Sequence, residues 1–111
     1  MIKGIFVPVE TGIPEIVETE HNLETLQSYV EGNIEIVQLG DTDVNIIVNE
    51  EGKIKGLPIN KMLLHDGRLV DFLAGNILIF GVDIEEGEIV SLPEEKIQKY
   101  IDMFSVDYIE I

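Results

Sequence analysis

Four of the seven basic residues in this chain of 111 lie within a single segment, residues 53–68. That segment contains one acid, Asp66, and so has a net charge of +3, whereas the rest of the chain has a net charge of −18. Lysine and arginine bind phosphates and carboxylates, and the glycines and proline of the segment favour turns whose N–H groups can also face an anion. We therefore predict a site for an anion such as a nucleotide at Lys53, Lys55, Asn60, Lys61 and Arg68. The alternative is that these cations only offset neighbouring carboxylates.

His65 and Asp66 are a second candidate, with Asp71 close behind in the sequence. A histidine beside a carboxylate can act as a general base or ligate a metal. Adjacent side chains in an extended segment point apart, however, and the other histidine, His21, stands among glutamates. The chain also lacks the motifs of a phosphate-binding loop and of a serine nucleophile. We expect a protein that is not an enzyme and needs no metal or cofactor. The alternative is a small hydrolase or metal-dependent enzyme that uses His65, Asp66 and Asp71.

Asp41, Asp43 and Asn45 place three oxygen-bearing side chains at alternate positions, as the first half of a calcium-binding loop does. The twelfth position of such a loop requires a bidentate glutamate, and here it is Gly52. A tight turn between two strands explains these residues better.

Acidic residues dominate the composition: 22 aspartates and glutamates against seven lysines and arginines give a net charge of −15. This charge disfavours direct binding to nucleic acid or to an anionic membrane. Carboxylates along one face can imitate the phosphates of duplex DNA and occupy the cationic groove of a DNA-binding protein. The competing interpretation is that the charge only keeps the protein in solution.

The location of the protein follows from what its sequence lacks. No apolar run approaches the length of roughly 18–20 residues that a membrane-spanning helix needs, and the residues after Met1 do not form a secretory signal. The chain contains no cysteine, so neither a disulfide framework nor a cysteine-bound metal can form. We expect a cytoplasmic protein.

Apolar periodicity predicts an α+β protein with one domain over residues 1–111, in the order ββαβββαβ. Leu23, Leu26 and Val30 share one helical face behind Asn22, so a helix is predicted at 23–31. A second helix is predicted at 93–104, with Ser91 and Glu94 as its capping box. The remaining elements are six to seven strands in a mostly antiparallel sheet. The unbroken apolar run at 46–48 indicates a central strand that is covered on both faces.

Residues 50–73 are the hardest part of the chain to assign, because glycine and proline interrupt them repeatedly. We predict a long loop over an apolar face, with one helical turn near 60–64 that Asn60 caps. Its apolar residues offer a further alternative, a homodimer contact of a plain structural module. Those residues are Met62, Leu63, Leu64, Phe72 and Leu73.

Three runs of residues resemble a known family: Asn-Glu-Glu-Gly-Lys-Ile-Lys-Gly-Leu-Pro-Ile-Asn-Lys at 49–61, Gly-Asn-Ile-Leu-Ile-Phe-Gly-Val-Asp at 75–83 and Ser-Leu-Pro-Glu-Glu at 91–95. The family consists of small proteins of unknown function from low-GC Gram-positive bacteria, their phages and mobile elements. The resemblance implies no catalytic residues. It implies a genomic setting in which small accessory proteins commonly inhibit host defence systems.

These observations together lead to one principal hypothesis. We expect a non-enzymatic phage or mobile-element factor that inhibits a host defence or regulatory component. It would act through a DNA-mimic-like acidic surface or by sequestering an anion at 53–68. The expected partner is a host protein or a small anionic ligand, and a homo-oligomer is consistent with either mechanism.

Overall fold

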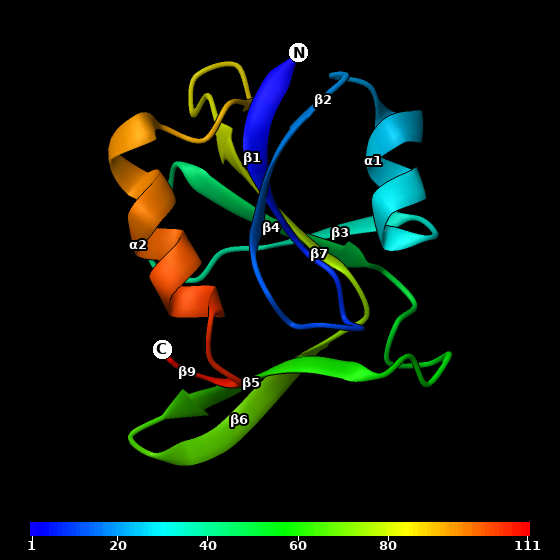
Figure 1. Ribbon diagram of the computed structural model, residues 1–111, viewed down its shortest axis with the longest axis vertical. Helices are drawn as coiled ribbons and strands as arrows, with labels where there is room; N and C mark the ends of the chain where they lie inside the picture. Colours follow the sequence, from blue (N-terminus) through cyan, green and yellow to red (C-terminus); the bar gives the residue numbers. More distant parts are fainter.

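The computed structural model describes residues 1–111 and contains two helices and nine strands (Figure 1). The helices are α1 (Leu23–Val30) and α2 (Glu94–Phe104). The strands are β1 (Ile2–Val7), β2 (Glu15–Thr19), β3 (Ile34–Val37), β4 (Val44–Asn49), β5 (Ile59–His65), β6 (Arg68–Ala74), β7 (Ile77–Val82), β8 (Ile89–Val90) and β9 (Tyr108–Glu110). The predicted α+β class is confirmed. Neither helix has the length and apolar character that crossing a membrane would require.

A six-stranded antiparallel sheet, here called the large sheet, forms the centre of the molecule. Its strand order is β2-β1-β7-β4-β3, and β8 pairs with the end of β7. The first two strands form the hairpin β1–β2, and the strands on either side of the turn predicted at Asp41, Asp43 and Asn45 form the hairpin β3–β4. The apolar run at 46–48 lies in β4, whose six residues are all buried, so the prediction of a strand covered on both faces is confirmed.

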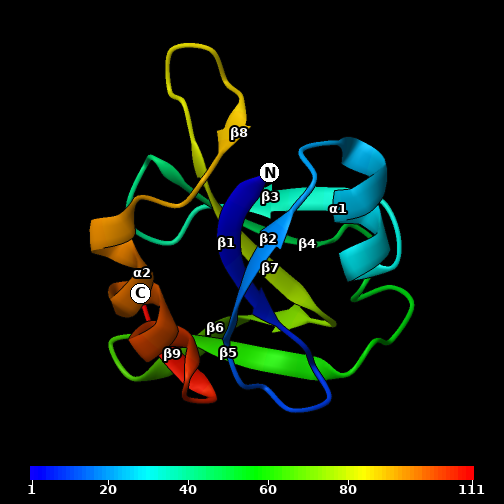
Figure 2. The same cartoon turned by 45° about the horizontal axis from the view of Figure 1, so that its top comes forward.

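Alternation along the central strands divides the core into two layers. Ile77 and Ile79 of β7 face α2 and belong to the main core cluster, whereas Leu78 and Phe80 face α1. Helix α1 covers one face of the large sheet, and α2 packs on the other (Figures 1 and 2). Successive side chains of a strand point to opposite faces of its sheet. A strand with apolar residues at every position therefore needs cover on both faces.

A second, three-stranded sheet shares the α2 side of the core, and we call it the small sheet. Its order is β6-β5-β9, with β5 and β6 antiparallel and β5 and β9 parallel. The prediction of a long loop with a helical turn near 60–64 is therefore wrong, since residues 59–65 and 68–74 form a hairpin. Asp66 and Gly67 make its two-residue turn with φ values of 52° and 76°. An Asp-Gly pair between apolar runs is a strong hairpin signal, because both turn positions need positive φ. This hairpin also explains why the strands number nine in two sheets, rather than six or seven in one.

Both predicted helices occur, but only one begins as expected. Asn22 caps α1, its side chain accepting a hydrogen bond from the Thr25 N–H at 2.8 Å. At α2 the capping position is Pro93, with no side-chain cap. The hydroxyl of Ser91 instead accepts from the Lys3 N–H at 2.9 Å, so the predicted capping box is absent. Ser91 fastens the segment before α2 to the first strand.

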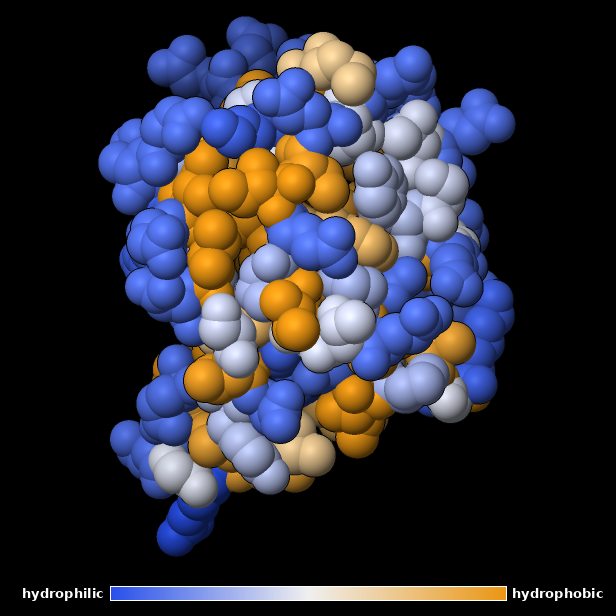
Figure 3. All heavy atoms as spheres, in the orientation of Figure 1, coloured by the Kyte–Doolittle hydropathy of each residue, from blue (hydrophilic) through white to orange (hydrophobic).

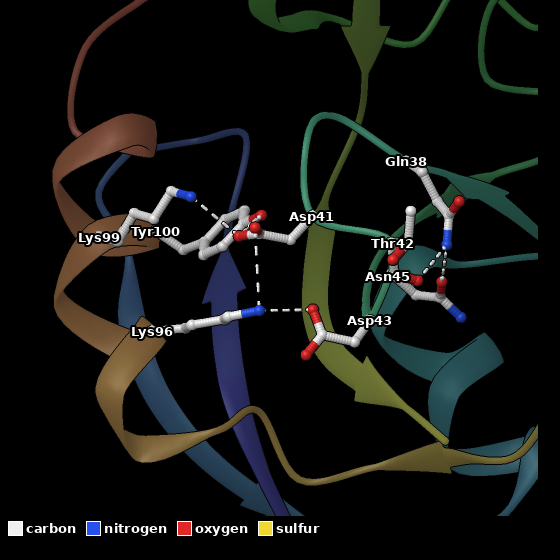
Figure 4. A network of polar contacts seen from close by, with 8 residues as sticks. All are labelled: Gln38, Asp41, Thr42, Asp43, Asn45, Lys96, Lys99 and Tyr100. Carbon is white, nitrogen blue, oxygen red and sulfur yellow. Dashed lines mark hydrogen bonds and ion pairs between the residues drawn. The ribbon is translucent and has the colours of Figure 1, made fainter. Parts of the chain in front are cut away.

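A polar network connects α2 to the β3–β4 turn (Figure 4). Asp41 accepts hydrogen bonds from the Nζ atom of Lys99 and the hydroxyl of Tyr100, each at 2.9 Å. Lys96 bonds Asp43 at 2.5 Å and lies 3.8 Å from Asp41. The two aspartates therefore brace α2 as well as forming a turn. The bond from Lys99, followed by that from Tyr100, lowers the pKa of Asp41 below its ordinary value of 3.8. Burial, and then the bond to Asp41, raises the pKa of Tyr100 to about 12.

This network predicts an acid-dependent contribution of Asp41 to stability. A carboxyl group whose pKa is lowered by folding stabilises the fold fully above its unfolded pKa, and that stabilisation is lost as pH falls through the folded value. The Asp41→Asn variant should therefore melt a few degrees below the wild type above pH 3.8, and the difference should shrink as the pH falls below 3.8. Thermal unfolding between about pH 6 and about pH 2 measures this difference.

The matched control for Asp41→Asn is Asp102→Asn, which alters an exposed aspartate of α2 whose side chain accepts only from Gln98. Its difference from the wild type should be small at every pH. A melting difference for Asp41→Asn that stayed constant down to the lowest pH would contradict the role assigned to this carboxylate.

Candidate functional site

The largest groove lies between the start of α1, the edge strand β3 and the loop that joins β7 to β8. Its volume is about 520 Å³, within the range of ligand-binding clefts. We call it the acidic groove. Its lining residues are His21, Asn22, Leu23, Leu26, Ile34, Gly87, Glu88 and Ile89.

The acidic groove has an apolar floor and a rim of carboxylates. Leu26 is buried in the floor beside the half-buried Ile34, while Leu23 at the edge is 56% exposed. Glu88 lines one side. On the other side, Glu24 occupies the first turn of α1, and Glu20 accepts a hydrogen bond from the Asn22 side chain at 3.2 Å. None of these three glutamates has a basic partner within ion-pair distance in the structure.

The β7–β8 loop forms one wall of the acidic groove and projects from the body of the molecule (Figure 2). Asp83 organises the loop: its side chain accepts from the N–H groups of Glu85 and Glu86, and its carbonyl accepts from Gly87 at 2.7 Å. Gly87 adopts a φ of 72°, a left-handed conformation that glycine tolerates. These hydrogen bonds therefore fix the backbone that carries the acidic side chains of the loop.

A second hollow, of about 500 Å³, lies on the other side of the same loop. Four of its seven lining residues are polar, and the exposed Ile84 of the loop borders it. Gln38 and Asn45, two of its lining residues, bond to each other at 3.3 Å, so part of the polar lining is already satisfied (Figure 4). The β7–β8 loop thus separates two depressions, and the one toward α1 is lined by more apolar residues.

Most of the basic side chains take part in ion pairs, but few of the acidic ones do. Five of the seven lysines and arginines lie within 4 Å of a carboxylate: Lys3, Lys53, Lys55, Lys96 and Lys99. Six of the 22 carboxylates lie that close to a lysine or histidine, which leaves 16 without such a partner. The negative charge therefore remains available to a partner.

The structure does not bring the predicted anion-binding residues together. Lys53 bonds Asp71 and lies 4.9 Å from the centre of the Phe72 ring. That bond lowers the pKa of Asp71. The Nζ atom of Lys55 lies 3.9 Å from a carboxylate oxygen of Glu51, four residues earlier in the chain. Arg68 is exposed beside the β5–β6 turn. Lys53 and Lys55 thus each have a carboxylate beside them, as in the alternative of local charge compensation.

Asn60 and Lys61 are buried under the β1–β2 loop, with 7% and 1% of their surfaces exposed. A register shift in β5 between Ile59 and Lys61 lets these consecutive residues face the same side. The Asn60 amide donates to the carbonyls of Val7 and Gly75 at 3.0 and 2.9 Å, and its Oδ1 atom has no partner. Asn60 is therefore a strand residue that joins three segments, and the predicted helix cap is wrong.

Lys61 donates from Nζ to the Gly12 carbonyl at 2.9 Å. Gly12 has a φ of 66°, a left-handed conformation that favours glycine. Burial lowers the pKa of Lys61, although the charge of Asp107 opposes the shift. Lys61 fastens the β1–β2 loop to the small sheet.

The candidate catalytic residues also separate. His65 donates from Nδ1 to the Ile111 carbonyl at 2.7 Å, and its Nε2 lies 3.7 Å from Asp66 at the exposed turn. Asp71 bonds Lys53 instead. No group of three or more histidine, cysteine, aspartate or glutamate side chains is placed to hold a metal ion.

The sequence analysis missed the acidic groove, because its lining comes from three separate segments of the chain. One signal was available in the run Asp-Ile-Glu-Glu-Gly-Glu at 83–88, which places four acids in six residues around a turn. That run predicts an acidic loop, but only the fold sets it opposite the start of α1.

The position of Asn60 predicts a large structural effect. The Asn60→Ala variant removes the donors to two carbonyl groups, and we expect it to lower the free energy of unfolding by about 2–4 kcal/mol. The matched control is Lys55→Ala, which removes an exposed cation of the same predicted site and should change stability by less than about 0.5 kcal/mol. Denaturant unfolding of both variants measures the two values. Equal effects would contradict the structural role of Asn60.

The comparisons with known proteins assign this chain to a family and give no activity. Residues 2–105 match the model of a family described as a domain of unknown function, DUF3846. No curated protein and no solved structure matches the chain. Because the match spans nearly all of the residues that form both sheets and both helices, the chain belongs to the DUF3846 family.

Proposed function

We propose that this protein is a non-enzymatic binding protein whose acidic groove holds a basic, partly apolar segment of a partner protein. The observation that carries the proposal is the groove itself. Leu26, Ile34 and Ile89 offer apolar surface there beside Glu88, and Glu20 and Glu24 adjoin its lining residues His21 and Leu23 in the chain. None of these three glutamates has a basic partner within ion-pair distance.

The chemistry of the groove specifies its partner. A segment with leucine-like side chains would gain about 25 cal/mol for each Å² of apolar surface that it buries on the floor. Lysines or arginines beside those side chains would meet the carboxylates of Glu20, Glu24 and Glu88. Charge complementarity of this kind mainly accelerates association and sets specificity, while apolar burial holds the complex together.

An apolar floor favours a protein segment over the two mechanisms expected earlier. The phosphate ladder of DNA has no apolar counterpart, so duplex mimicry would leave Leu23 and the floor unused. Sequestration of a small anion needs converging cations, and Lys53, Lys55 and Lys61 have separate partners. A basic partner in the acidic groove would instead be attracted by the negative charge that the chain has in excess.

The setting implied by the family resemblance adds a role to this proposal. A phage or mobile-element protein that holds a basic segment of a host defence or regulatory component would inhibit it by occupation. The phage origin and the inhibition remain predictions, and the binding experiment below does not depend on them.

We expect a labelled helical peptide with leucines on one face and lysines on the other to bind the wild type. Fluorescence anisotropy at salt concentrations between about 50 and about 500 mM should show affinity falling as salt rises, because screening weakens the contacts with the carboxylates. Replacing Glu20, Glu24 and Glu88 by glutamine together should weaken binding by about tenfold or more.

A triple variant with the same net charge separates the groove from the overall charge. Glu10→Gln, Glu50→Gln and Glu95→Gln remove three exposed carboxylates outside the groove lining and should leave the affinity within about twofold of the wild type. Leu23→Ser tests the apolar edge and should weaken binding at every salt concentration. The proposal fails if the two triple variants lose affinity equally, or if the wild type does not bind the peptide.

A further inference from the structure

The outer face of the small sheet exposes apolar side chains that the fold itself does not cover. Leu63, Leu73 and Ile109 point inward and belong to the main core. Their strand neighbours Met62, Phe72 and Tyr108 point outward, and the strand pairing places them side by side in one row across β9, β5 and β6. Leu64 and Leu69 form a second pair on the same face. Apolar side chains are visible over this sheet at the lower end of the molecule in Figure 3.

The exposure of these residues is large for a protein that acts alone. Leu69 and Tyr108 are each 58% exposed, Val70 is 54% exposed and Ile59 is 48% exposed. With the half-buried Met62, Leu64 and Phe72, they expose on the order of 500 Å² of apolar residues. That value is near the upper end for the largest patch of a typical monomer, and exceeds half of the roughly 800 Å² that each partner buries in a standard interface. Ile59, Met62 and Tyr108 also line a hollow of about 260 Å³ on this face.

The edge of the small sheet is less suited to pairing than its face. The N–H of Phe72 in the edge strand β6 is bonded at 2.8 Å to the side chain of Asp71, the preceding residue. An added strand would have to displace this bond. The flat face carries no such obstacle, and two sheets pack face to face at about 10 Å through side chains of this kind.

Charge selects a second copy of this chain as the occupant. Around the apolar row lie Arg68, which has no carboxylate within ion-pair distance, and the acids Asp107 and Glu110, which have no basic partner. A rim with both signs is complementary to itself in a twofold interface. Arg68 supplies the unpaired positive charge of this rim, since Lys61 is buried and donates to the Gly12 carbonyl, while Lys53 and Lys55 pair with Asp71 and Glu51.

We propose that the outer face of the small sheet is a homodimer interface, in which the rows Tyr108–Met62–Phe72 of two copies pack against each other across a twofold axis. Leu63 and Leu73, two of the residues predicted from the sequence to form such a contact, lie in the core instead. The interface is apolar at its centre, so added salt should strengthen the dimer or leave it unchanged. This salt response is opposite to that of the acidic groove, and the two proposals therefore fail independently.

Sedimentation equilibrium of the whole chain at about 1–100 μM tests this interface. The wild type should be dimeric, and Leu69→Lys with Tyr108→Lys should weaken self-association by about tenfold or more. Both positions are exposed, so circular dichroism should show an unchanged fold. The matched control is Ile16→Lys, at a residue that is 52% exposed on β2 and pairs with Ile5 of the large sheet, outside the small sheet.

Single cysteines provide a second measurement, because the natural chain has none. Under mild oxidation Leu69→Cys or Val70→Cys should form a disulfide-linked dimer, and Ile16→Cys should not. A wild type that is monomeric over the whole concentration range would overturn the proposal. A dimer that Ile16→Lys disrupts, and that the double lysine variant leaves intact, would also overturn it.

Discussion

The structure depends on the burial of β7 on both of its faces. Ile77, Leu78, Ile79 and Phe80 are completely inaccessible to solvent, so each side of the strand must be covered by another layer. Helix α1 supplies one layer, and α2 with the small sheet supplies the other. Its neighbours β1 and β4 satisfy its backbone groups on both edges. The loop after β7 and the start of α1 consequently meet at one place, where the acidic groove forms.

Several of the few cations connect separate elements of the fold. Lys96 and Lys99 hold α2 against the β3–β4 turn, and Lys61 fastens the β1–β2 loop from a buried position. Exposed ion pairs contribute little energy individually, but here they fix the contacts between separate elements. Because so few cations are present, most carboxylates stay unpaired, and the acidic groove keeps its charge.

The two proposed surfaces lie at opposite ends of the molecule. The β7–β8 loop is at the upper end in Figure 1, and the small sheet is at the lower end. A dimer formed through the small sheets would leave both acidic grooves exposed and directed away from each other. Such an arrangement can bind two basic segments of one partner or of an oligomeric partner. Avidity would then raise the affinity without any new contact, provided that the spacing of the segments matches.

Local chemistry was sufficient to determine several elements from the sequence alone. Apolar periodicity identified both helices, Asn22 identified the start of α1, and the unbroken run at 46–48 identified a strand with two covered faces. Residues 59–74 were misassigned because Gly56, Pro58 and Gly67 were given more weight than the Asp-Gly turn signal that joins two apolar strands. The composition gave the charge of the candidate site but not its place. Only the tertiary structure could separate the cations of 53–68, bury Asn60 and Lys61, and set residues 83–88 opposite residues 20–24. Those outcomes depend on contacts between residues far apart in the chain, which spacing along the sequence does not encode.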